Sequence, residues 1–104
     1  MTYKKEIKHL AKSIIDNLKD AQMLFDYAKE AKENQNPELA NYFFMKTKTR
    51  LQMLNEDHQK AMDLIKKEEI ENKQPYQEGK WDCLHEYLIK EKEKIDYSIA
   101  NFKI

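Results

Sequence analysis

The chain has 104 residues, a length typical of one domain, and its 19 basic residues equal its 19 acidic ones, which argues against binding nucleic acid through excess positive charge. One glycine and two prolines argue against β-hairpin folds and glycine-rich phosphate loops, and one cysteine excludes a disulfide framework. No apolar run reaches the roughly 20 residues that cross a bilayer, and the N-terminus lacks the apolar stretch of a signal peptide, so we expect a cytoplasmic protein with no membrane partner.

The first predicted helix runs from about residue 3 to residue 33. Apolar residues recur there at spacings of three and four, which places them in one stripe on an α-helix. The segment 34–37 interrupts this pattern. Asn36 suits the N-cap of a new helix, and Pro37 suits its first position, where the missing N–H has no partner within the helix. The stripe consists of Ile7, Leu10, Ala11, Ile14, Leu18, Ala21, Leu24, Phe25, Ala28 and Ala31.

Two further helices are predicted over residues 37–71 and 80–102, with a polar linker between them. Short connections make consecutive helices antiparallel neighbours. The expected fold is therefore all-α, a single domain over residues 1–104 that forms an up-down-up three-helix bundle. The second stripe is Ala40, Phe44, Thr47, Leu51, Leu54, His58, Ala61, Met62 and Ile65, and the third is Trp81, Leu84, Leu88, Ile95, Ile99 and Phe102.

Polar residues within these stripes are the candidates for a functional site. With a rise of about 1.5 Å per residue along antiparallel helices, His58 falls level with Asn17 and within a turn of Glu91. One interpretation is a hydrogen-bonded polar layer that sets the register of the helices. The other is a metal site in which His58 binds a cation together with Glu91 of the same layer.

Two segments resemble the rubrerythrins of the ferritin-like superfamily. In that family's first helix a carboxylate ligand precedes a tyrosine by seven residues, and Asp20 and Tyr27 match this spacing. In its second helix Glu-x-x-His supplies two metal ligands from one helix face, and here Asn55 and His58 occupy those positions. The resemblance covers roughly residues 19–65. It implies a ferritin-like helical hairpin followed by a third helix.

The resemblance also implies iron or another divalent metal as cofactor. The implied ligands are Asp20 and His58, with Glu86 or Glu91 from the third helix. Asn55 replaces the bridging glutamate of the family, and a neutral amide cannot bridge two cations as a carboxylate does. The implied site therefore requires ligands from a second copy across a two-fold axis. The residues expected around these ligands, or in a polar layer, are Asn17, Tyr27 and Asn55.

A second histidine pattern points to zinc. Glu6 and Asp82 are each followed three residues later by a histidine, His9 and His85. The first and third helices run parallel in the predicted bundle, so the two histidines fall at a similar height, with Cys83 nearby. Imidazole and thiolate are zinc ligands. The alternative is that His9, which lies off the apolar stripe, faces solvent.

The segment 42–45 places bulky apolar side chains around most of one helix, because successive residues are 100° apart. One helix seam cannot bury all four, so Tyr42, Phe43 and Met45 are either partly exposed or form a self-association surface. Because a chain of this length buries only about 60–70% of its unfolded surface, we expect a homodimer. The sequence favours a non-catalytic interaction or self-association module of ferritin-like shape. The alternative is an iron-binding protein whose site is completed at the dimer interface.

Overall fold

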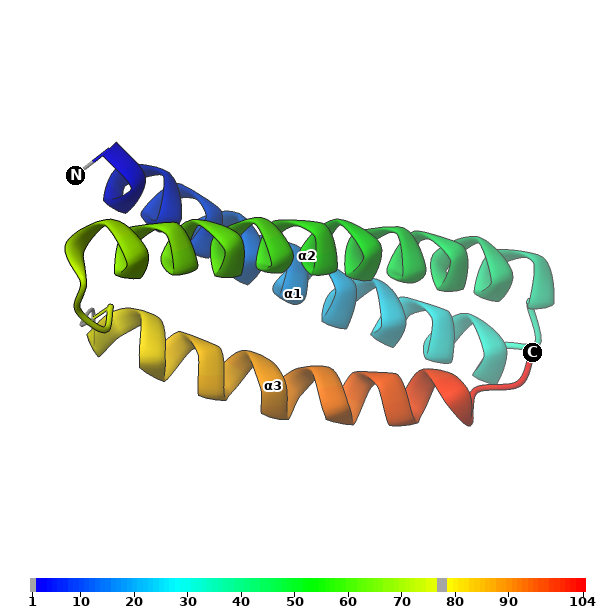
Figure 1. Cartoon of the computed structure of the whole chain (residues 1–104). Helices are drawn as coiled ribbons and strands as arrows, with labels where there is room; N and C mark the ends of the chain where they lie inside the picture. The colour runs from blue at the N-terminus through cyan, green and yellow to red at the C-terminus, as the bar shows by residue number, and fades with distance from the viewer. Residues whose placement is uncertain (1, 77–78) are drawn as a thin grey trace.

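The computed structural model describes residues 2–76 and 79–104 and contains three α-helices, with no strand in these ranges. Helix α1 spans Thr2–Glu33, α2 spans Pro37–Asn72 and α3 spans Gly79–Ala100. The helices lie side by side in an elongated up-down-up bundle, with α3 parallel to α1 (Figure 1). The predicted all-α bundle is thereby confirmed. None of the three helices, within the described residues, is long and apolar enough to span a membrane.

The turn between α1 and α2 forms as the sequence predicts. The side-chain oxygen of Asn36 accepts a hydrogen bond from the backbone N–H of Leu39 at 3.2 Å, and Pro37 opens α2. Gln35 takes a left-handed conformation with φ of 60°, and Lys73 does the same with φ of 53° where it ends α2. A residue with a side chain is disfavoured in this region, which glycine enters freely. The chain reverses sharply at both positions.

The core consists of the predicted stripes. Helices α1 and α2 approach closely along most of their length, whereas the backbone of α3 approaches α1 at few points and stands further from α2. Large side chains such as Trp81 and Leu88 fill that wider gap. Met62 departs from the prediction, with 38% of its surface exposed, because Ala61, about 100° away around α2, takes the inward-facing position. One core cluster contains Ile7, Leu10, Ile14, Leu18, Leu54, Ala61, Ile65, Trp81 and Leu88, and a second contains Ala21, Leu51 and Ile95.

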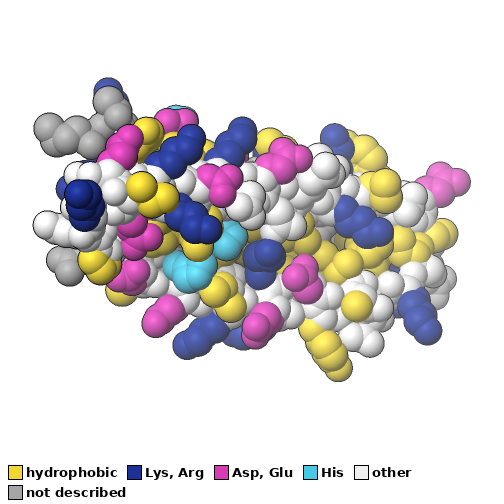
Figure 2. Space-filling model, viewed as in Figure 1, with side chains coloured by type: hydrophobic (Ala, Val, Ile, Leu, Met, Phe, Trp, Pro, Cys, Tyr) yellow, Lys and Arg dark blue, Asp and Glu magenta, His cyan; other side chains and the backbone are white. Residues whose placement is uncertain are grey.

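Aromatic rings hold the C-terminal segment against the bundle. The ring of Phe102 lies 5.3 Å from that of Phe25 and 5.1 Å from that of Phe44, measured between centroids. Phe102 was predicted as part of the third helix, but α3 ends at Ala100 and the chain then turns toward α1 and α2. Figure 2 shows apolar side chains gathered at this end of the bundle.

Candidate functional site

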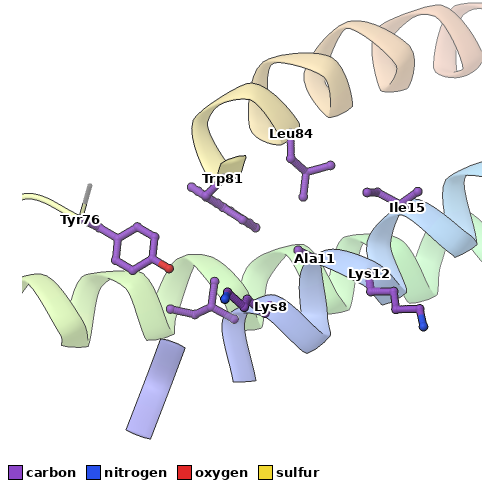
Figure 3. Close-up of a pocket in the computed structure, with 8 residues that line it drawn as sticks. Lys8, Ala11, Lys12, Ile15, Tyr76, Trp81 and Leu84 are labelled. Atoms are coloured by element: carbon purple, nitrogen blue, oxygen red, sulfur yellow. The ribbon is translucent and has the colours of Figure 1, made fainter. Parts of the chain in front are cut away.

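An apolar groove lies between α1 and α3. Its volume is about 370 Å³. Trp81 and Leu84 extend from α3 toward α1, and Tyr76 closes one end (Figure 3). The groove exists because α3 stands away from α1, so that small residues such as Ala11 leave space beneath it. It is lined by Ile7, Lys8, Ala11, Lys12, Ile15, Tyr76, Trp81 and Leu84.

The α1 side of this groove is basic. Lys8 and Lys12 are exposed, and among the described residues neither side chain forms an ion pair. Lys5 and His9 are also exposed and line a shallow hollow with the same two lysines, together with one acidic residue, Glu6. An apolar floor next to unpaired ammonium groups matches a ligand that combines apolar and anionic parts. The sequence did not reveal this groove, because lysines on the exposed side of a helix carry no signal that sets them apart from an ordinary solvated face.

A histidine pair joins α2 to α3. Nε2 of His58 lies 3.2 Å from Nδ1 of His85, and the indole ring of Trp81 stacks against both imidazoles at centroid distances of 6.3 and 6.0 Å. Burial, the neighbouring His85 and the positive charge of Lys92 all lower the pKa of His58 below its usual 6.5. The pair is half-buried. It shares one hydrogen bond when at least one ring is neutral.

The structure corrects the predicted position of His58. The sequence places His58 beside Glu91, whereas in the structure it lies opposite His85, which precedes Glu91 by six residues on α3. Within the described part of the linker, the backbone N–H of Tyr76 donates to the carboxylate of Glu69 at 2.9 Å, which holds Tyr76 beside the last turns of α2. Six residues of offset amount to about 9 Å along a helix.

Glu91 faces α1 instead of α2. Its carboxylate accepts a hydrogen bond from Nε2 of Gln22 at 3.2 Å and lies 3.7 Å from the ammonium group of Lys94. Glu86, the other acidic residue predicted on the third helix, is exposed. The predicted layer of Asn17, His58 and Glu91 is therefore divided between different partners, and these side chains do not meet.

Asn17 belongs to a polar network between α1 and α2. It is buried, and its Nδ2 donates to Oδ2 of Asp57 at 3.4 Å, while Ser13 donates to the same oxygen at 2.6 Å. Its Oδ1 accepts from Nη1 of Arg50 at 3.4 Å, and that guanidinium nitrogen lies 3.9 Å from Asp20. Of the predicted polar layer, Asn17 therefore forms hydrogen bonds between α1 and α2, and its partners are Asp57 and Arg50. Sequence reasoning missed Asp57 and Arg50, which flank the apolar stripe and look like surface charges.

The remaining predicted residues are dispersed. Asn55, His9 and Cys83 are exposed, so the pairing of His9 with His85 is wrong because the partner of His85 is His58. Tyr27 is 43% exposed and packs its ring 5.3 Å from that of Phe43. Within residues 2–76 and 79–104, no group of three or more His, Cys, Asp and Glu side chains could hold a metal ion. The iron site implied by the resemblance stays a prediction that needs ligands from a second chain.

No protein-family model, curated protein or solved structure matches this chain. A function for this protein is therefore inferred from the physical chemistry of the groove and of the histidine pair.

Proposed function

We propose that this protein is a non-catalytic interaction module that binds an acidic amphipathic helix of a partner protein in the groove between α1 and α3. The observation that carries the proposal is an open apolar groove of about 370 Å³ with the exposed ammonium groups of Lys8 and Lys12 on its α1 side. Helix-in-groove recognition uses apolar anchors at spacings of three and four residues. The flanking positions of such a helix then lie beside the charged side of the groove.

The dimensions of the groove suit about two turns of helix. Its floor extends from Ile7 to Ile15, which is roughly 12 Å along α1. Two leucine-sized anchors one turn apart fit this length, and burying each contributes about 1.5–3 kcal/mol before the entropic cost of association. Glutamates beside the anchors pair with Lys8 and Lys12. Each exposed pair adds at most about 1 kcal/mol, so charge selects the partner while the apolar anchors supply most of the affinity.

Trp81 provides the assay, because it is the chain's single tryptophan and it lines the groove. The probe is a synthetic amphipathic helix with leucine anchors flanked by glutamates, compared with the same peptide carrying lysines in place of the glutamates. We expect the acidic peptide to shift the Trp81 emission and to bind at least about tenfold more tightly than the basic one, with affinity falling as salt rises. Equal affinity for the two peptides, or no binding of either, contradicts the proposal.

A charge reversal tests the lysines directly. Lys8→Glu combined with Lys12→Glu should weaken binding of the acidic peptide and strengthen binding of the basic one. The matched control is Lys60→Glu combined with Lys67→Glu, which makes the same change in net charge on exposed positions of α2 away from the groove. The control should leave the ratio of the two affinities nearly unchanged. If both double variants alter that ratio equally, only the net charge matters and the groove is not the binding site.

The outer face of α2 favours self-association as a second candidate function. Tyr42 is 55% exposed and Met45 54% exposed, and Met53, two to three turns further along α2, is 41% exposed. We propose that this face forms a homodimer. Met45→Lys should shift sedimentation velocity profiles toward the monomer at micromolar concentration. Tyr97→Lys, on α3 at a residue that is 73% exposed, is the control and should leave the profile unchanged. A purely monomeric unmodified chain at that concentration contradicts the proposal.

A further inference from the structure

The two nitrogens of the histidine pair are already at metal-ligand spacing. In a tetrahedral site with Zn–N bonds of about 2.0–2.1 Å, two nitrogen ligands lie about 3.3 Å apart. Nε2 of His58 and Nδ1 of His85 are separated by 3.2 Å. A metal ion bound by both lies about 1.2 Å to one side of the line that joins them. The separation of the two nitrogens then needs little change, and each ring turns so that its lone pair points toward the ion instead of along the hydrogen bond.

The surroundings keep the lone pairs available. A ligand imidazole must be neutral, and burial together with the nearby positive groups lowers the pKa of His58, which favours that form. The stacked indole of Trp81 restricts the orientation of both rings. Two histidine side chains lie next to each other at the surface between α2 and α3, so an ion can reach them from solvent (Figure 2).

We propose that His58 and His85 form a two-imidazole binding site for a divalent transition-metal ion of the class that prefers imidazole, Zn²⁺, Ni²⁺ or Cu²⁺. Water completes the coordination, because no further His, Cys, Asp or Glu of the described ranges joins the pair in a three-ligand group. The site differs from the implied iron site, which draws on carboxylates. The two ligands lie outside the lining of the proposed peptide groove, and Trp81 is the residue that contacts both sites.

Metal binding at this position clamps α3 to α2. The two helix backbones do not approach closely, so the pair is one of the direct polar links between them. An ion that binds the folded chain and finds no paired imidazoles in the unfolded chain raises thermal stability by mass action. At a metal concentration about one hundred times the dissociation constant, the midpoint of unfolding should rise by about 10 °C for a chain of this size.

The experiment titrates the full chain, free of any histidine tag, with ZnCl₂ and NiCl₂ by isothermal calorimetry. Thermal unfolding is then measured at a metal concentration about one hundred times the dissociation constant obtained. We expect one ion per chain. His58→Gln and His85→Gln should each weaken binding at least about tenfold, the scale of losing one ligand from a two-ligand site. His9→Gln, which removes an exposed histidine of α1, is the matched control and should bind like the unmodified chain. If His9→Gln loses as much affinity as His58→Gln, or no stoichiometric binding is found, the site does not exist.

Two further measurements keep the test independent of folding defects in the glutamine variants. Lys92→Gln leaves both ligands in place and removes a neighbouring positive charge, so it should tighten Zn²⁺ binding about threefold, the scale of a partly screened charge interaction. In the unmodified chain, paramagnetic Cu²⁺ should quench Trp81 fluorescence at stoichiometric concentration, because the indole stacks on both proposed ligands. Quenching that requires a large excess of Cu²⁺, or weaker binding by Lys92→Gln, contradicts the proposal.

Discussion

Replacing Leu88 with alanine tests how firmly α3 is held in the bundle. Leu88 is only 1% exposed and packs in the core cluster that also contains Trp81. The substitution removes three carbon atoms, worth about 2.4 kcal/mol of transfer free energy, and leaves a cavity that the surrounding helices close only in part, so the free energy of unfolding should fall by about 3 kcal/mol. This loss is a large part of the roughly 5–15 kcal/mol that stabilises a typical domain.

Urea denaturation measured in parallel by circular dichroism and Trp81 fluorescence provides the assay. The neighbouring Ile89→Ala is the matched control, because it makes a similar change on the same helix at a residue that is 42% exposed. Its cost should stay below about 1 kcal/mol. If Leu88→Ala costs no more than Ile89→Ala, then α3 does not pack as the structure places it. Hydrogen exchange adds a regional readout: amides of α3 should lose more protection in Leu88→Ala than those of α1.

Three further predictions follow from local features of the fold. Folding lowers the pKa of His58, so the unfolded chain binds the proton more readily. Stability should be intact above about pH 6.5 and fall as the pH drops through the folded-state value, and His58→Gln should flatten this dependence in urea titrations at several pH values. Gln35→Gly and Lys73→Gly should each raise the free energy of unfolding by about 0.5–1 kcal/mol, since glycine suits φ of 60° and 53°. Thermal midpoints that do not change in these variants count against the two turn conformations. Asn36→Ala should lower the free energy of unfolding by about 1 kcal/mol because it removes the N-cap of α2, whereas Asn36→Asp keeps a capping oxygen and should lower it little. Equal effects of the two substitutions in thermal unfolding contradict the capping role.

The local structure of this protein could be read from its sequence. Spacings of three and four between apolar residues indicate which side of each helix faces inward, and Asn36 with Pro37 marks the start of α2 within the chain. The register of α1 against α2 was also predictable. Only three residues connect these helices, so the chain allows few offsets, and contacts such as Asn17 with Asp57 and Phe25 with Phe44 occur at the expected level.

The position of α3 was decided by the tertiary structure. Periodicity specifies a face of a helix but carries no information on how far one helix slides along another, and a six-residue linker permits offsets of several turns. In the observed offset, the backbone N–H of Tyr76 donates to the carboxylate of Glu69. That offset of about 9 Å brings His58 to His85 and leaves Glu91 beside Gln22. The same placement leaves the groove between α1 and α3, which Trp81 and Leu84 line from α3 and Ala11 lines from α1.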